Sequence, residues 1–264
     1  MDKKIRIALC QTNIKWEDKE ANIARAAELI SEAADKGASL VLFPEMSFTG
    51  FSMNIAATRE RDMSTVNRMR ELAVSNNIAI GFGWVNAVED KAENRYCVIA
   101  DDGSVISDYS KIHSFRYGGE CDQFVSGNDI RSFEYKGIRF TPFICYDLRF
   151  PEIFRAVNDK TDVYIVPANW PGRRSGHWKT LLQARAIENQ AYVLGINCAG
   201  DIGGLYYSGD SCVIGPDGTV MEMISDREGM ICADIDSSAL EVRKTFPVLD
   251  DRKQDLYLKL YGSK

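Results

Sequence analysis

Three short apolar segments of this chain each lead to a side chain that can take part in chemistry. Residues 40–42 lead to Glu45, a strand-like stretch leads to Lys111, and residues 141–144 lead to Cys145. Short apolar runs of this kind indicate buried β-strands. If the strands are parallel neighbours, their carboxyl ends converge on one crevice, the usual ligand site of α/β proteins. The sequence therefore predicts that a carboxylate, an ammonium and a thiol meet at one place.

Cys145 stands where a strand is expected to turn into a helix that contains Pro151 and Glu152. A thiol on such a tight turn would lie exposed above the sheet edge, where the N–H groups that open the helix favour its thiolate. Many free cysteines are inert core residues, so position alone does not identify a nucleophile. Asp147 and Arg149, next to this thiol, are expected to brace the turn rather than react.

The combination of the three groups is more specific than any one of them. A carboxylate beside a thiol can act as general base, a buried ammonium can stabilise an oxyanion, and a cysteine can carry an acyl group between two half-reactions. The chemistry that these groups predict is hydrolysis of an amide or a nitrile.

Secondary-structure patterns predict an α/β chain with mixed sheets. Helices are expected over residues 18–36 and around 63–75, the first stopped by Gly37. Turn residues at 101–103 and at 217–218 indicate hairpins. The expected strands cover residues 5–10, 40–43, 78–85, 95–100, 105–109, 162–166, 211–214 and 220–224. This pattern predicts a two-layered sheet core with helices outside.

Length and composition fit a compact enzyme. With 264 residues and 45% hydrophobic content, the chain can bury one sizeable core, so residues 1–264 are expected to form a single domain. A net charge of −6 gives no electrostatic footprint for nucleic acid or for an anionic membrane. No run reaches transmembrane length, and the N-terminal apolar stretch is too short for a signal peptide.

The numbers of cysteines and histidines indicate the cellular compartment and whether a metal site is expected. Seven cysteines, an odd number without framework spacing, fit a reducing compartment, so we expect a cytoplasmic protein. The chain has only two histidines and no cysteine cluster with zinc spacing, so we expect no metal and no cofactor.

Several motifs, in order and at similar spacing, resemble the carbon-nitrogen hydrolases, or nitrilase superfamily. They are Phe43-Pro44-Glu45, the Lys111 segment, residues 145–152, Ala168-Asn169-Trp170 and residues 177–190. The resemblance covers nearly the whole chain. It implies a four-layer α-β-β-α sandwich and pairing of sandwiches through their helices, and hence a homodimer or a larger homo-oligomer.

The same resemblance implies roles for individual residues. Glu45, Lys111 and Cys145 correspond to the catalytic triad of that family, and Glu120 corresponds to a second glutamate that orients the lysine. The backbone N–H of Tyr146 corresponds to a donor of the oxyanion hole.

Within the superfamily the likeness is greatest to the omega-amidases, which hydrolyse the terminal amide of 2-oxoglutaramate and 2-oxosuccinamate. It is carried by residues 113–116, by Asn169-Trp170-Pro171 with Arg174, and by residues 207–211. In one departure, Cys121-Asp122-Gln123 stands where bacterial members have a histidine-rich pattern. The triad also serves N-carbamoyl compounds and nitriles, so the substrate stays open at this point.

Substrate recognition is expected from loops at the same edge. The long loop 110–128 has the length of a binding element or lid, and Arg116 within it is either a substrate ligand or an ordinary surface arginine. After Trp170, a further candidate for substrate binding, come Arg173 and Arg174. One of them could clamp a substrate carboxylate bidentately, and we favour Arg174.

Two rival interpretations were weighed. A Cys-His hydrolase using His113 or His177 would leave Glu45 and Lys111 without a role. A catalytically silent homologue that binds a partner would be favoured by loss of a triad residue, but all are present. Arg185 and Glu188, three residues apart on a predicted helix, are expected to form a structural ion pair.

Overall fold

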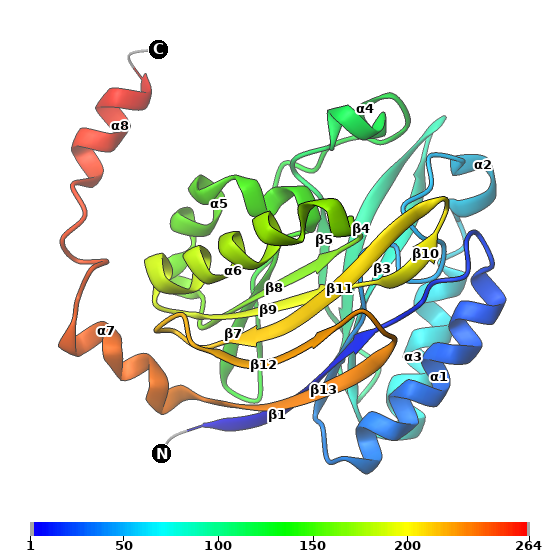
Figure 1. Ribbon diagram of the computed structural model, residues 1–264, viewed down its shortest axis with the longest axis horizontal. Helices are drawn as coiled ribbons and strands as arrows, with labels where there is room; N and C mark the ends of the chain where they lie inside the picture. Colours follow the sequence, from blue (N-terminus) through cyan, green and yellow to red (C-terminus); the bar gives the residue numbers. More distant parts are fainter. Residues whose placement is uncertain (1–2, 263–264) are drawn as a thin grey trace.

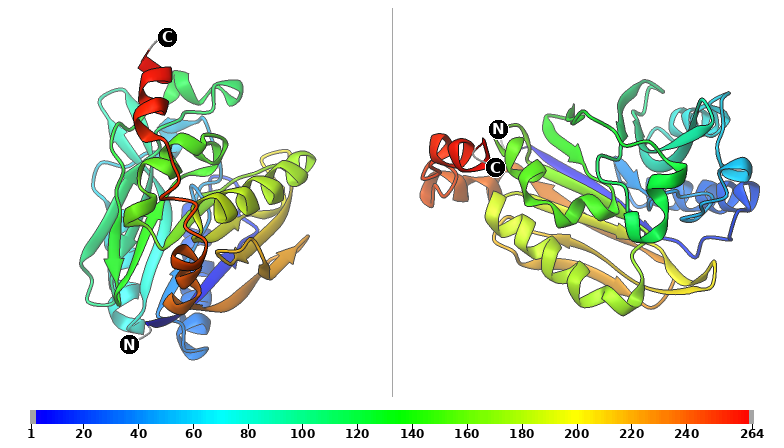
Figure 2. Two further views of the ribbon diagram at one scale, coloured as in Figure 1. Left: turned by 90° about the vertical axis from the view of Figure 1, so that its left-hand side faces the viewer. Right: turned by 90° about the horizontal axis from the view of Figure 1, so that it is seen from above.

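Two mixed β-sheets lie face to face between two layers of helices in the computed structural model, which describes residues 3–262 (Figure 1; Figure 2). This arrangement is the α-β-β-α sandwich that the family resemblance implied, and it confirms the two-layered sheet core that the sequence patterns predicted. The first sheet has the strand order β13 (Gly229–Asp236), β1 (Lys4–Gln11), β2 (Leu40–Leu42), β3 (Ala79–Val88), β4 (Lys91–Ile99) and β5 (Val105–Ser110). In it β1, β2 and β3 run parallel, whereas the other neighbours are antiparallel.

The second sheet has the order β10 (Ala199–Ile202), β11 (Leu205–Ile214), β9 (Tyr192–Asn197), β8 (Val163–Ala168), β7 (Ile138–Pro142) and β6 (Phe133–Tyr135). A seventh strand, β12 (Val220–Ser225), pairs with β11 across the hairpin predicted at residues 217–218. Here β7, β8 and β9 are the parallel strands.

Alternation along the short strand β2 shows how one sheet serves two cores. Leu40 and Leu42 point toward the second sheet and belong to the cluster that also holds Phe140 and Leu194. Val41, between them, points outward to the helices. Burying one such side chain contributes roughly 1.5–3 kcal/mol, so this pattern fixes both the register and the stacking of the layers.

Helices α1 (Lys19–Asp35) and α3 (Ser64–Asn76) cover the outer face of the first sheet. The side chain of Asp18 caps α1 by accepting a hydrogen bond from the N–H of Ala21 at 3.1 Å. Helices α5 (Pro151–Ala156) and α6 (Ser175–Asn189) cover the second sheet through side chains such as Phe154 and Leu182.

The remaining helices are short and lie outside these layers. They are α2 (Ile55–Thr58), α4 (Glu120–Gln123), α7 (Val242–Thr245) and α8 (Gln254–Gly262). Helix α8 stands apart from the sandwich in Figure 1, and Leu258 on it is 72% exposed. None of the helices within residues 3–262 combines the length and the apolar character that crossing a bilayer requires.

The sequence patterns missed three hairpins: β3–β4, β6–β7 and β10–β11. Strand β3 runs on to Val88 and pairs with the start of β4, where Val88 faces Lys91. The predicted strand ends earlier, at Val85, where full burial ends, because the last three residues of β3 are only half-buried. A criterion based on buried runs finds only the covered part of such a strand.

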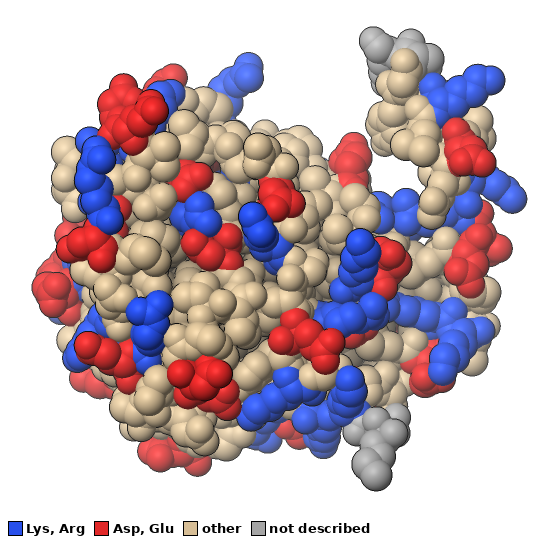
Figure 3. Space-filling model, turned by 180° about the vertical axis from the view of Figure 1, so that it is seen from behind, with Lys and Arg blue, Asp and Glu red and all other residues tan. Residues whose placement is uncertain are grey.

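Charged side chains of both signs are interspersed on the face of the molecule drawn in Figure 3. That distribution agrees with the modest net charge of −6. It offers no broad basic surface on this face.

The fold holds the turn that carries Glu45 directly against Gly83 of β3. Ser47 accepts a hydrogen bond from the N–H of Gly83 at 2.8 Å and donates its own N–H to the Gly83 carbonyl at 3.1 Å. A Cβ at Gly83 would overlap the amide nitrogen of Met46 and lie 2.8 Å from the carbonyl carbon of Glu45. Only glycine allows this close approach of two backbones.

We therefore expect Gly83→Ala to lower the free energy of unfolding by about 1–3 kcal/mol, because the added methyl displaces the adjacent turn. Denaturant unfolding followed by circular dichroism measures the change. Gly176→Ala is the control, since a Cβ there meets no atom within 4 Å. Equal stability of both variants would show that the turn does not depend on this contact.

Candidate active site

A buried lysine lies between two buried carboxylates at the edge of the sandwich. The Lys111 ammonium, just after β5, lies 2.8 Å from Oε1 of Glu45 and 3.0 and 2.9 Å from the two oxygens of Glu120. None of the three side chains is more than 2% exposed. Burial alone would lower the pKa of Lys111, but the carboxylates of Glu120 and Glu45 raise it above its ordinary value. The lysine therefore stays charged and holds both carboxylates in place.

Two asparagines complete the hydrogen bonds of Glu45. The amide of Asn94 donates to Oε1 of Glu45 at 2.8 Å and to Oε1 of Glu120 at 2.9 Å. The backbone N–H of Asn169 donates to Oε2 of Glu45 at 2.9 Å. Sequence reasoning missed Asn94, although a signal existed: in β4 it alternates with Ala92 and Tyr96 at the buried positions, where a polar side chain needs a reason.

Cys145 begins a 3₁₀ turn, Cys145–Arg149, that follows strand β7. Its φ of 45° lies in the left-handed region, which costs a non-glycine residue about 1–3 kcal/mol. The buried Asp147 carboxylate stabilises this turn by accepting hydrogen bonds from the N–H of Ile144 at 3.0 Å, the N–H of His113 at 2.9 Å and the hydroxyl of Tyr109 at 2.7 Å. The bracing role predicted for Asp147 is thus confirmed. Its carboxylate also connects the turn Cys145–Arg149 to the segment that follows Lys111.

The surroundings of Cys145 oppose the thiolate that the turn was expected to favour. Burial raises the pKa of the Cys145 thiol well above its ordinary value of 9.0, and the neighbouring Glu45 carboxylate raises it further. Lys111 acts in the opposite direction but does not reverse the shift. The environment thus favours the protonated thiol, which lies beside a carboxylate that can accept its proton.

The strands that deliver these groups are not the parallel neighbours that the sequence suggested. Strands β2 and β5 belong to the first sheet, with β3 and β4 between them, and β7 belongs to the second sheet. The groups meet because the two sheets stack with these strand ends at the same edge. The stacking of two sheets depends on contacts between side chains that are far apart in the sequence. Local sequence patterns carry no information about such contacts.

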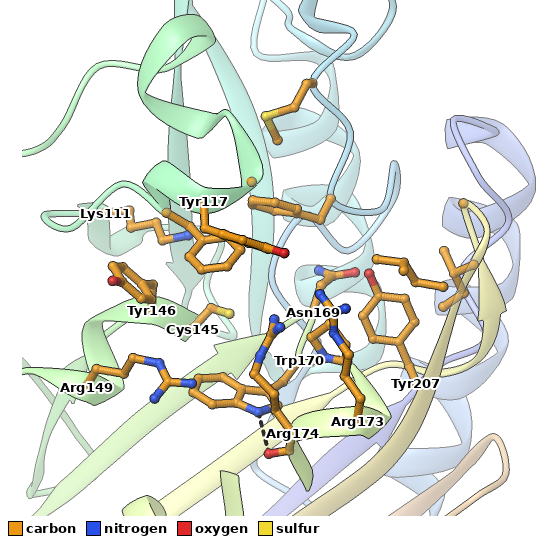
Figure 4. A pocket seen from close by; sticks show the side chains of 18 of the residues that line it. Lys111, Tyr117, Cys145, Tyr146, Arg149, Asn169, Trp170, Arg173, Arg174 and Tyr207 are labelled. Atoms are coloured by element: carbon orange, nitrogen blue, oxygen red, sulfur yellow. Dashed lines mark hydrogen bonds between the residues drawn. The ribbon is translucent and has the colours of Figure 1, made fainter. Parts of the chain in front are cut away.

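A pocket of about 270 Å³ opens above Cys145 (Figure 4). Of the predicted site residues, Lys111, Cys145, Tyr146, Trp170 and Arg174 line it. Glu45 and Glu120 are fully buried behind the lysine. The structure does not bring Arg116 into this lining: it is exposed on the short turn Arg116–Gly118. The pocket residues that sequence reasoning had not assigned include Trp16, Phe51, Met53, Tyr117 and Tyr207.

Three guanidinium groups face this pocket. Arg149 was expected to brace the turn, but its guanidinium lies 4.8 Å from the Trp170 ring centre and lines the pocket with Arg173 and Arg174. None of the three forms an ion pair with a carboxylate of residues 3–262. Burial lowers the pKa of Arg174, and the positive charges of Arg173 and Arg149 lower it further. A bound anion would relieve this mutual repulsion.

The family model of the carbon-nitrogen hydrolases matches residues 6–244. The chain belongs to the carbon-nitrogen hydrolase family. It is 36% identical to the omega-amidase YafV of Escherichia coli over 250 residues, which cover 94% of this chain and 96% of the relative. It is 34% identical to the 2-oxoglutaramate amidase of Bacillus subtilis over 259 residues, which cover 96% of this chain and 100% of the relative.

Solved structures agree with this assignment. A CN-hydrolase superfamily protein of Xanthomonas campestris, with an arsenic adduct in its active site, superimposes with a TM-score of 0.89 at 34% identity, covering 95% of this chain and 97% of the other. A double mutant of the amidase from Nesterenkonia, in complex with acrylamide, gives a TM-score of 0.89 at 25% identity, covering 97% of each chain. The present carbon-nitrogen hydrolase is a thiol-dependent amidohydrolase.

The histidines of this carbon-nitrogen hydrolase lie outside the pocket lining. The Nδ1 atom of His113 lies 2.8 Å from Asp147, and its ring stacks on Phe150 with centroids 3.7 Å apart. This placement disfavours a Cys-His mechanism. The predicted ion pair of Arg185 and Glu188 is present at 3.0 Å.

The structure also bears on metal binding by the carbon-nitrogen hydrolase. Within residues 3–262, no group of three or more His, Cys, Asp or Glu side chains is placed to hold a metal ion.

The protonation state of Cys145 can be measured by the ultraviolet absorbance of its thiolate, which the protonated thiol lacks. The difference in absorbance between the wild type and Cys145→Ala should indicate little thiolate up to pH 9.0, because burial and Glu45 raise the pKa of the Cys145 thiol. Glu45→Gln removes one of these causes, so its thiolate step should move to lower pH, measured against the matching Cys145→Ala double variant. A wild-type step well below pH 9.0 would contradict the protonated resting state.

Proposed function

We propose that this enzyme hydrolyses the terminal amide of a short dicarboxylate monoamide, with 2-oxoglutaramate and 2-oxosuccinamate as the model substrates. The observation that carries the proposal is the set of guanidinium groups of Arg149, Arg173 and Arg174, which have no carboxylate partner among residues 3–262 and face the same pocket as Cys145. A substrate of this class has an uncharged amide for the nucleophile and a carboxylate for the arginines. The similarity to an omega-amidase and to a 2-oxoglutaramate amidase supports the same class.

In the first half-reaction, Glu45 accepts the proton of the Cys145 thiol as the sulfur attacks the amide carbon. The Lys111 ammonium and the Tyr146 N–H stabilise the oxygen of the tetrahedral intermediate, which carries the negative charge. The C–N bond then breaks, Glu45 returns the proton to the leaving nitrogen, and ammonia departs. An acyl thioester on Cys145 remains.

In the second half-reaction, Glu45 takes a proton from water as the water oxygen attacks the thioester carbon. The C–S bond breaks, the carboxylic acid is released, and the sulfur regains its proton from Glu45. Glu120 takes no proton in this scheme. Its two contacts with Lys111, at 3.0 and 2.9 Å, hold the ammonium in position through both steps.

Recognition of the substrate carboxylate is assigned to Arg174, with Arg149 on the neighbouring wall of the pocket. Arg174 is partly buried, and its guanidinium lies 5.6 Å from the ring centre of Phe115, which limits the orientations available to it. A guanidinium can donate two parallel hydrogen bonds to a carboxylate. Trp170 and Tyr146 form walls beside the nucleophile. Arg116, outside the pocket lining, has no part in this proposed clamp.

Ammonia release from a panel of compounds tests the proposed substrate class. The panel holds 2-oxoglutaramate, succinamate, glutamine, an N-carbamoyl amino acid, an aliphatic amide and a nitrile. We expect turnover of the first two to dominate, and Cys145→Ala to lower kcat by about 10,000-fold or more while the protein stays folded. Faster turnover of another compound of the panel would keep the mechanism but assign a different substrate class. No ammonia release from any of the six compounds would favour a binding protein without catalysis.

Arg174→Gln tests the proposed clamp directly. Loss of a charge-assisted hydrogen bond costs about 1.5–3 kcal/mol, so kcat/KM for 2-oxoglutaramate should fall about 10- to 100-fold, mainly through KM. Lys160→Gln, on an exposed surface turn, is the matched control for removal of one positive charge. An unchanged KM in Arg174→Gln would assign the carboxylate to another arginine.

We further propose that the chain is one domain, acts as a homodimer or larger homo-oligomer, and resides in the cytoplasm. The central core joins side chains of both sheets, which supports one domain. The exposed apolar side chains of α8, such as Leu256 and Tyr261, support assembly because a short helix in water needs a partner. All seven cysteines are unpaired, as expected in a reducing compartment.

A further inference from the structure

A buried carboxylate outside the catalytic group collects three serine hydroxyls. Asp210 has a side chain that is 6% exposed. Its Oδ2 accepts hydrogen bonds from Ser175 and Ser208, and its Oδ1 from Ser225, each at 2.7 Å. Lys179 lies 3.7 Å from Oδ1. A charge withdrawn from water to this degree is costly unless it is paired and hydrogen-bonded, so this arrangement needs a structural reason.

The backbone directs Asp210 toward these hydroxyls. Strand β11 pairs Gly209 with Ser225 and then Ser211 with Ile224, so Asp210 is the extra residue of a β-bulge. Gly209 and Asp210 both have left-handed φ values, 70° and 58°. A Cβ at Gly209 would overlap the side chain of Gln11, so the bulge requires glycine there. Bulges of this kind re-aim one side chain, and here the side chain is Asp210.

One of the three serines connects this carboxylate to the substrate pocket. Ser175, the first residue of α6, directly follows Arg174. The turn Gly172–Arg174 rests on β11, because a Cβ at Gly172 would lie 2.9 Å from the ring of Tyr206. The indole N–H of Trp170 donates to the carbonyl of Arg174 at 2.9 Å. The backbone of Arg174 is therefore held on one side by Trp170 and on the other by the bond from Ser175 to Asp210.

Figure 4 shows Arg173 and Arg174 extending from this turn into the pocket. An arginine side chain is long and flexible, so it can present a fixed fork to a carboxylate only if its backbone is fixed. The other two hydroxyls on Asp210 come from β11 and β12, on the sheet side. They hold the Asp210 carboxylate in place, and the hydrogen bond from Ser175 to that carboxylate fixes the adjacent turn Gly172–Arg174.

We propose that Asp210, acting through Ser175, is a positioning residue for substrate specificity: it fixes the Gly172–Arg174 turn so that its arginines meet the substrate carboxylate. This proposal rests on the proposed function, since it concerns how the anionic end of that substrate is held. Neither residue touches the reacting atoms. Their loss should change recognition of the carboxylate and leave the chemistry at Cys145 intact.

The test compares two variants that each remove one hydroxyl from the same carboxylate, Ser175→Ala and Ser225→Ala. Ser175→Ala should raise KM for 2-oxoglutaramate about tenfold with little change in kcat, since misplacement of a binding group weakens binding more than chemistry. Ser225→Ala should raise KM much less, because Ser175 still holds Asp210. Inactivation by iodoacetamide, a neutral thiol reagent, should proceed at the wild-type rate in both variants, which shows that the Cys145 site is intact.

The double variant Arg174→Gln/Ser175→Ala separates this proposal from the proposed clamp. If Ser175 acts through Arg174, the double variant should have the KM of Arg174→Gln alone. Equal KM values for Ser175→Ala and Ser225→Ala, or a fall in kcat and in the inactivation rate, would overturn the positioning role whatever Arg174 does. If Arg174→Gln leaves KM unchanged while Ser175→Ala still raises it, the positioning role is supported, and the substrate carboxylate is assigned to Arg173 instead of Arg174.

Discussion

The buried ammonium of Lys111 is the interaction on which the site depends. It lies within 3.0 Å of both Glu45 and Glu120, and all three side chains are withdrawn from water. Two carboxylates at this depth would repel each other if no cation lay between them. The Lys111 ammonium offsets this repulsion, and Asn94 adds a hydrogen bond to each carboxylate. A carboxylate oriented to act as general base can therefore lie in the interior of this sandwich.

That arrangement has a consequence for the nucleophile. The same burial and the same Glu45 carboxylate that make a base available also raise the pKa of Cys145, which favours the protonated thiol. The proton then moves to a carboxylate that is already oriented by Lys111, Asn94 and the N–H of Asn169. In the proposed mechanism, attack and proton transfer therefore occur together in the bound complex.

Recognition is separated from chemistry by location and by type of charge. Cys145 and Lys111 line one part of the pocket, with Glu45 and Glu120 buried behind the lysine, whereas the guanidinium groups of Arg149, Arg173 and Arg174 line another part without carboxylate partners among residues 3–262. The guanidinium groups of Arg149 and Arg174 lie beside aromatic rings. The turn that carries Arg173 and Arg174 packs against strand β11. Changes in that turn can alter the substrate without disturbing the thiol, the lysine or the glutamates.

The sequence by itself determined the central elements of both sheets and the residues proposed to react. Apolar runs that end at Glu45, Lys111 and Cys145 are local features, and so are the hairpin turns at 101–103 and 217–218, because each depends on neighbours within a few residues. Only the tertiary structure decided the rest. It placed the strand ends of two different sheets at one edge, turned Arg149 into the pocket, kept Arg116 out, and brought Asn94 between two glutamates. Its burial of Cys145 also opposes the thiolate that the local turn was expected to favour. These outcomes depend on burial and on contacts between residues far apart in the chain, and neither quantity is present in a local pattern.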